Sequence, residues 1–245
     1  MHSRNYCARD ISVTLSFRQH RTADPDIPGR PGDGWEGRLM TATSTITRHA
    51  QAPKAGSVVT PERYKQGLDS FKAWMDAIEL NKENFQRHYD EWQPDADDIA
   101  AIKAAVDKHG VKALVLGEDW CPDVWRGLPT IARIGELTGM EIRYFKRDEN
   151  KDIMSEFLKN GEFESIPVIV LYDRDHKYLG HWIERADKAN AEMPALRSIL
   201  AGVERDTPAW DEARKKYNAA TWEYAEGWRD AEASELRALI EEALG

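Results

Sequence analysis

Short apolar runs alternate with helical patterns between Val111 and Leu200, and this order constrains the fold more than any other feature of the chain. A short, fully apolar run predicts a buried strand, and apolar residues spaced three and four apart predict one face of a helix. The expected strands cover 111–116, 140–145, 167–172 and 178–183, and the expected helices cover 122–137, 151–159 and 187–200. The last two strands are joined by a short turn, so we expect an α/β fold with a mixed sheet and helices on both of its faces.

Helical patterns flank this centre on both sides. Thr60-Pro61 is a helix-start signal, and the apolar residues after it predict one helix over 61–78. Asn81 is expected to end that helix, a second helix is expected around Phe85 to Trp92, and a third over 97–109. We therefore divide the chain into a helical extension (57–96), an α/β domain (97–202) and a C-terminal helical extension (203–245).

The first 56 residues differ in composition from the rest. Seven of the fourteen residues from Asp24 to Gly37 are Pro or Gly, which predicts a disordered tail over 1–56. Met40 opens a second plausible start, so translation from Met40 and a genuine tail are both open. The choice affects the thiol chemistry, because Cys7 lies in this part.

Charge and cysteine content exclude several classes of function. A net charge of −9 argues against a nucleic-acid binder, and no apolar stretch approaches the roughly 18 residues that span a bilayer. The 2 cysteines form no disulfide framework, and no Cys/His spacing predicts a metal site. We expect a cytoplasmic protein that needs no cofactor and binds neither nucleic acid nor membrane.

Cys121 stands where a strand ends and a helix begins, in the segment Trp120-Cys121-Pro122-Asp123-Val124. Unpaired backbone N–H groups at a helix start favour a thiolate, and proline suits the first helical turn. A redox or nucleophilic cysteine needs this placement, so Cys121 is the candidate catalytic residue.

These residues give the chain a resemblance to the thioredoxin superfamily over about 97–202. Trp120-Cys121 follows a strand and an acidic turn, and Pro129 stands where thioredoxins carry a helix-kinking proline. Ile166-Pro167 precedes a strand like the family's cis-proline, and Gly180 lies in the last strand. Three stretches are similar to bacterial thioredoxin-family proteins of poorly defined function: 118–121, 145–150 and 180–182.

The resemblance implies a substrate groove beside Cys121, formed by Trp120, Pro122, Ile166 and Pro167. With Pro167 in the cis form, the adjacent backbone is expected to pair with an extended substrate as an added strand. A turn proline that merely fits the fold is the structural alternative.

Two departures from the family pattern affect the mechanism. Val124 occupies the position of the second cysteine, so a mixed disulfide formed at Cys121 has no local resolving thiol. Val115 occupies the position of the buried acid that serves that second thiol. The chain is therefore not expected to be an ordinary dithiol reductase.

Acidic residues surround the thiol in sequence. Glu118, Asp119 and Asp123 are each expected to cost the thiolate roughly 1 kcal/mol at about 7 Å, with Arg126 as the nearby cation. Glu118 and Asp119 are possible acid–base auxiliaries, although turn capping is the commoner use of such residues. His181 is a possible proton-transfer residue, although a surface histidine of the hairpin is the simpler interpretation.

Three functions fit these observations. The first is a thiol protein in redox homeostasis that forms a mixed disulfide through Cys121 with a low-molecular-weight thiol or a client protein. The second is a non-catalytic thioredoxin-like interaction module. The third, a glutathione-dependent iron–sulfur protein like the single-cysteine glutaredoxins, lacks their glutathione-binding pattern near Cys121.

Overall fold

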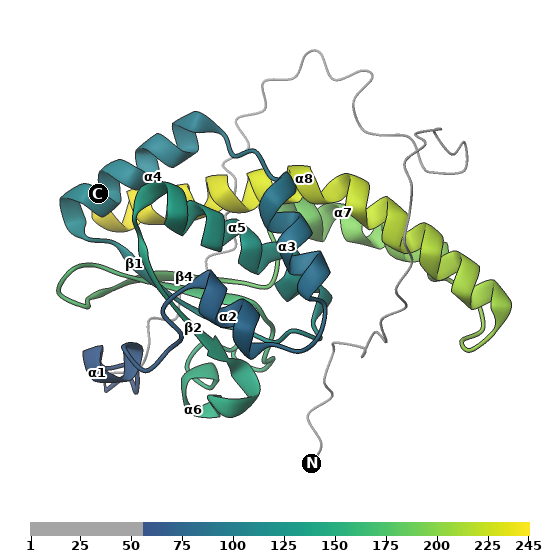
Figure 1. The fold of residues 1–245 in the computed structure, drawn as a ribbon, viewed down its shortest axis with the longest axis horizontal. Helices are drawn as coiled ribbons and strands as arrows, with labels where there is room; N and C mark the ends of the chain where they lie inside the picture. Colours follow the sequence, from purple (N-terminus) through teal and green to yellow (C-terminus); the bar gives the residue numbers. More distant parts are fainter. Residues whose placement is uncertain (1–55) are drawn as a thin grey trace.

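A four-stranded mixed sheet forms the centre of the computed structural model, which describes residues 56–245 (Figure 1). The strands are β1 (Lys112–Gly117), β2 (Glu141–Lys146), β3 (Val168–Tyr172) and β4 (Tyr178–Ile183), in the order β2-β1-β3-β4. β1 pairs with β2 in parallel, and β3 is antiparallel to both β1 and β4. The mixed α/β sheet expected from the sequence is confirmed, with each strand boundary within one residue of its prediction.

Helices cover the sheet unequally. The longer helices and α6 are α2 (Phe71–Ala77), α3 (Lys82–Glu91), α4 (Ala96–His109), α5 (Pro122–Thr138), α6 (Lys151–Met154), α7 (Asp187–Arg197) and α8 (Pro208–Leu244). Helices α4, α5 and α8 pack on one another over one face of the sheet, and α6 lies toward the other face with the short helix α1 (Pro61–Tyr64) (Figure 1). Gly180 on β4 leaves room for the Leu239 side chain of α8, because a Cβ there would lie 2.7 Å from it.

The helix boundaries follow local signals in the sequence. Thr60, Ser70, Asp95 and Thr207 each accept a backbone N–H in the first turn of the helix that follows, and Gly110 and Gly139 end α4 and α5 in the left-handed conformation. Asn81 also adopts the left-handed conformation and separates α2 from α3, as predicted.

The single helix predicted over 61–78 is wrong. The chain forms α1, then pairs with the edge of β2 through reciprocal backbone hydrogen bonds between Leu68 and Tyr144, and then begins α2 (Phe71–Ala77) at the Ser70 cap. Gly67 permits this close approach, since a Cβ there would lie 2.5 Å from the Phe145 ring. The backbone hydrogen bonds available at the edge of β2 therefore decide the conformation around Leu68, although the spacing of apolar residues there is helical.

Two other helices differ in length from their predictions. α6 ends at Met154 instead of 159, and turns that include the Lys159↔Phe163 bridge carry the chain toward β3. The last part of the predicted 187–200 helix is the 3-10 helix η2 (Ser198–Leu200). The C-terminal extension is one continuous helix, α8, which runs beside α4, α5 and α7.

Candidate functional site

Cys121 begins α5 and is fully buried. Its φ and ψ of −87° and 121° are extended, Pro122 follows in the first helical turn, and the N–H groups of Val124 and Trp125 donate to the Cys121 carbonyl. The side chain is 0% exposed, and Sγ lies 3.9 Å from the carbonyl oxygen of Ile166. The predicted placement of the cysteine at a strand-to-helix junction is therefore present, but with the thiol closed off from solvent.

The Ile166–Pro167 peptide bond is cis, which confirms that expectation. Ile166 is 2% exposed, and Pro167 is also buried. Its carbonyl accepts a 2.8 Å hydrogen bond from the Glu184 N–H. Of the four predicted groove residues, only Trp120 and Pro122 reach the surface, so the groove is closed in this structure.

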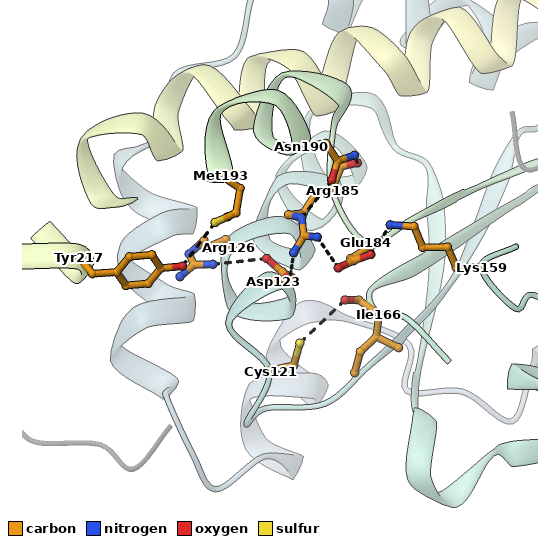
Figure 2. A network of polar contacts seen from close by, with 10 residues as sticks. All are labelled: Cys121, Asp123, Arg126, Lys159, Ile166, Glu184, Arg185, Asn190, Met193 and Tyr217. Atoms are coloured by element: carbon orange, nitrogen blue, oxygen red, sulfur yellow. Dashed lines mark hydrogen bonds and ion pairs between the residues drawn. The ribbon is translucent and has the colours of Figure 1, made fainter. Parts of the chain in front are cut away.

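A chain of ion pairs runs beside Cys121 and the cis-proline segment (Figure 2). We call it the ion-pair chain, and its members in order are Lys159, Glu184, Arg185, Asp123 and Arg126. The first three contacts measure 2.5 Å (Lys159–Glu184), 2.6 Å (Glu184–Arg185) and 2.7 Å (Arg185–Asp123), and the last, Arg126–Asp123, is 3.4 Å. It connects the first turn of α5 to the segment that follows β4.

Arg185 is the middle member of the ion-pair chain. Burial alone would lower the pKa of Arg185, but the charges of Asp123 and Glu184 outweigh burial and hold that pKa above its usual value. The charge of a Cys121 thiolate also raises the pKa of Arg185, so the thiolate and the guanidinium stabilise each other electrostatically. Asp123, expected to oppose the thiolate, is neutralised by Arg185 and Arg126.

Glu118 and Asp119 hold neighbouring segments in place. A Glu118 carboxylate oxygen accepts the Asp148 N–H at 2.7 Å, and burial raises the pKa of Glu118 above its usual value. One Asp119 carboxylate oxygen accepts the N–H groups of Glu79 and Leu80, both at 2.8 Å. These contacts match the turn-capping interpretation.

His181 is 6% exposed, so its assignment as a surface histidine of the hairpin is wrong. The ring hydrogen-bonds through Nδ1 to the Tyr178 hydroxyl and packs edge-on against Phe157, on the opposite side of β4 from α8. Successive side chains of a strand point to opposite faces of the sheet, so His181 lies on the face away from α8. Phe157 covers that face, which the sequence pattern had suggested was exposed to solvent.

Sequence reasoning missed the residues that close the site. Glu184 and Arg185 follow β4, and Glu184 adopts a positive φ of 73°, which lets its N–H reach Pro167. From α8 come Arg229 and Glu232, and Glu232 approaches Gly127 so closely that a Cβ on Gly127 would lie 3.1 Å from Oε2. A Glu-Arg pair directly after the last strand was the one available signal, whereas the approach of α8 depends on tertiary packing.

The mixed sheet and a cysteine that begins a helix opposite a cis-proline define a thioredoxin-like protein. The thioredoxin family model matches residues 68–197, more than half of the chain, and the chain belongs to this family. Membership indicates a redox-related role. No curated protein matches the chain.

Two solved structures are similar to the chain. An HIV epitope-scaffold has a TM-score of 0.51 and 18% identity, with 74% of this chain and 96% of the scaffold covered. A protein of unknown function from Pseudomonas aeruginosa has a TM-score of 0.48 and 19% identity, with 74% and 95% covered. At such low identity the scaffold supports the fold alone.

Residues 56–245 contain no helix that is both long and apolar enough to cross a membrane. No group of three or more His, Cys, Asp or Glu side chains among them is arranged to hold a metal ion. Cys121 is the sole cysteine of this part of the chain, since Cys7 lies outside the described residues.

Proposed function

We propose that the protein is a monothiol redox protein of the thioredoxin family, in which Cys121 exchanges with the disulfide of a low-molecular-weight thiol or of a client protein. The observation that carries this proposal is the position of the Cys121 thiol, at the start of α5, facing the cis-proline segment and coupled to Arg185. Helix starts and nearby cations both favour the thiolate, which is the reactive form. The cytoplasm, where thiols are kept reduced, suits such a protein.

The exchange involves two displacements. The Cys121 thiolate attacks one sulfur of a disulfide, a new bond to Sγ forms, and the other sulfur leaves as a thiolate. Because position 124 is valine, a second external thiolate then attacks the mixed disulfide and releases Cys121 as thiolate. No net oxidant is consumed, since each disulfide bond that breaks is replaced by another.

A movement of the ion-pair chain is required for this chemistry, because the thiol is fully buried. Glu184 and Arg185 belong to the short segment between β4 and α7, and they connect to α5 mainly through Asp123. Displacement of this segment also frees the carbonyl of Pro167 from the Glu184 N–H. We infer that opening exposes Cys121 and the cis-proline edge together.

The test is the pH dependence of iodoacetamide alkylation at Cys121, in the full chain carrying Cys7→Ser. The proposal predicts a native-state rate that titrates at or below the usual thiol pKa of about 8.5, with Cys121→Ser abolishing both alkylation and mixed-disulfide formation. Retention of thiol exchange by Cys121→Ser would overturn the proposal.

A non-catalytic interaction module is the second candidate, and the complete burial of Cys121 favours it. In this case Cys121 is a core residue, and the surface around Trp120 and Pro122 contacts a partner protein. This function predicts alkylation only at the rate of global unfolding. Equal alkylation and unfolding rates, measured across a urea series, would support the module and exclude the monothiol mechanism.

A further inference from the structure

A small cleft lies beside the start of α5, between the end of β4, the start of α7 and the middle of α8. Its volume is about 30 Å³, which exceeds the roughly 10–15 Å³ that one water molecule needs and suits a small polar group. Three arginines line it, Arg126, Arg185 and Arg229, together with the rings of Trp182 and Trp228. The cleft thus concentrates cations within a partly apolar wall.

Two of these arginines are paired less fully than Arg185. Arg126 is 8% exposed and lies over the Trp125 ring, and its ion pair among the described residues is the 3.4 Å contact to Asp123, longer than a normal charge-assisted hydrogen bond. Arg229 is 5% exposed, hydrogen-bonds through Nη1 to His88 Nδ1, and leaves its buried Nε without a partner. Within residues 56–245, no carboxylate lies at ion-pairing distance from Arg229.

The carboxyl groups of the cleft do not balance these charges. Asp123 and Glu184 both pair with Arg185, which also donates to Asn190, so each of its three guanidinium nitrogens has a partner. Glu232 is buried with no partner for Oε1, and burial raises its pKa well above the usual value, which favours the neutral acid. Burial lowers the pKa of Arg229, the charges of Glu226, Glu91, Asp230 and Glu232 oppose that shift from beyond ion-pairing distance, and arginine stays charged at neutral pH.

Buried charges in proteins are paired, because an unpaired ion loses its hydration without compensation. Two buried, incompletely paired guanidinium groups line one cleft together with a carboxyl oxygen that has no partner, and this arrangement indicates a site for an anion. A planar guanidinium matches the two oxygens of a carboxylate, and a protonated Glu232 supplies one further donor.

We propose that this cleft binds the carboxylate of a small acid between Arg126 and Arg229, with its apolar part against Trp182 and Trp228. The cleft is lined by Asp123, two residues after Cys121, so the acid is the low-molecular-weight thiol or disulfide on which Cys121 acts. This last assignment rests on the proposed function, whereas the anion site rests on the arginines alone.

The anion site is tested by thermal unfolding of the full chain at constant ionic strength. Potassium acetate and potassium phosphate should raise Tm saturably relative to potassium chloride, because a ligand that binds the folded state stabilises it. The rise should disappear in Arg126→Gln and in Arg229→Gln and persist in Arg133→Gln, a matched variant on α5 whose arginine pairs with Glu136 outside the cleft.

Two results would overturn the site: no saturable shift in the wild-type chain, or equal shifts in Arg126→Gln and the wild type. Arg126→Gln leaves the His88–Arg229 contact intact, so it stays informative where Arg229→Gln fails to fold. A response to acetate but not phosphate, or the reverse, distinguishes a carboxylate from a phosphate as the source of the oxyanion.

The substrate assignment is tested by the rate of mixed-disulfide formation at Cys121, followed by mass spectrometry in the Cys7→Ser chain. Dithiodiglycolate, which carries carboxylates, should react about tenfold faster than uncharged hydroxyethyl disulfide, as one hydrogen-bonded ion pair allows, and Arg126→Gln should remove the preference. Equal rates in the wild type would refute the thiol assignment and leave a site for a separate acid. No reaction with either disulfide refutes the proposed function, while the unfolding experiment still decides the anion site.

Discussion

Arg185 Nη1 donates to Asp123 Oδ2 at 2.7 Å, and this contact joins the segment after β4 to the first turn of the cysteine helix. Both side chains are largely buried, with exposed fractions of 14% and 12%. The same guanidinium is electrostatically coupled to Cys121. In the proposed mechanism, Arg185 therefore has two opposing effects on the thiol: it favours the thiolate, and it helps to keep the thiol buried.

Arg185→Gln should separate these two effects. In the Cys7→Ser chain, iodoacetamide alkylation of Cys121 should accelerate about tenfold on the high-pH plateau of the rate–pH profile, because a buried charged hydrogen bond of the closed state is lost. The midpoint of the rate–pH profile should shift upward, because a cation that favours the thiolate is removed. Arg133→Gln is the control, and a slower plateau in Arg185→Gln would contradict the proposed role of Arg185 in keeping Cys121 buried.

Val124→Cys should convert the site to a dithiol. Position 124 lies three residues after Cys121 on the same first turn, it is fully buried, and valine and cysteine are similar in size. The variant should form an internal disulfide, detected as a loss of two mass units, and should reduce insulin in the presence of dithiothreitol while the wild type does not. Val124→Ala controls for the loss of packing, and a Val124→Cys chain with two thiols that never oxidise would contradict the assigned geometry.

Asp119→Ala should affect stability and leave the thiol chemistry unchanged. One carboxylate oxygen accepts two backbone N–H groups from the α2–α3 connection, both of them exposed, so its loss returns two donors to water and should cost about 1 kcal/mol. Urea unfolding measures this cost, and Asp119→Asn, which keeps one acceptor oxygen, should lose less. A slower alkylation of folded Cys121 in Asp119→Ala would instead assign Asp119 a chemical role.

The sequence predicted the sheet well because strand signals here are strong and local. Every strand lies within one residue of its expected range, and Cys121, Pro122 and the cis-proline occupy their expected places. The errors arose where long-range packing decided the outcome. Leu68 pairs with Tyr144 at a sheet edge, and His181 is covered by Phe157, contacts that no periodicity in either segment encodes.

The surroundings of Cys121 also depend on long-range contacts that the sequence pattern does not encode. The acidic residues around Cys121 were visible in the sequence, and their net effect was expected to oppose the thiolate. Their partners determine the actual effect: Asp123 pairs with Arg185, which is 62 residues away, and Asp119 binds a connection about 40 residues earlier. Distant partners of this kind depend on the fold, so a charge count near a cysteine does not determine its environment.

Glu232→Gln should stabilise the protein increasingly as the pH rises. Burial, with the Glu235 charge adding to it, raises the Glu232 pKa well above 4.5, so the folded state keeps a proton that the unfolded state releases. Wild-type stability therefore falls as the pH rises above 4.5, toward the folded-state pKa. Urea unfolding at pH 5 and pH 8 should give a larger advantage for Glu232→Gln at pH 8. Equal differences at the two pH values would show that Glu232 is ionised in the folded protein.

His88→Asn should flatten the acid side of the same stability profile. The imidazole is 1% exposed between Trp125 and Trp222, and burial, together with the charges of Arg229, Arg126 and Arg87, lowers its pKa from 6.5 to about 2. Below pH 6.5 the unfolded chain binds a proton that the folded chain does not, so stability falls by roughly 1.4 kcal/mol per pH unit.

Asparagine keeps an acceptor near the Nδ1 position for Arg229 and does not titrate, so the comparison concerns slopes rather than absolute stability. Between pH 7.5 and pH 5, urea unfolding should show His88→Asn losing about 2 kcal/mol less than the wild type, as the slope below pH 6.5 implies. Glu232→Gln is the matched control, because it changes the profile in the opposite direction. Parallel profiles for His88→Asn and the wild type would mean that the folded state accepts a proton at His88, and that the Arg229 contact breaks when it does.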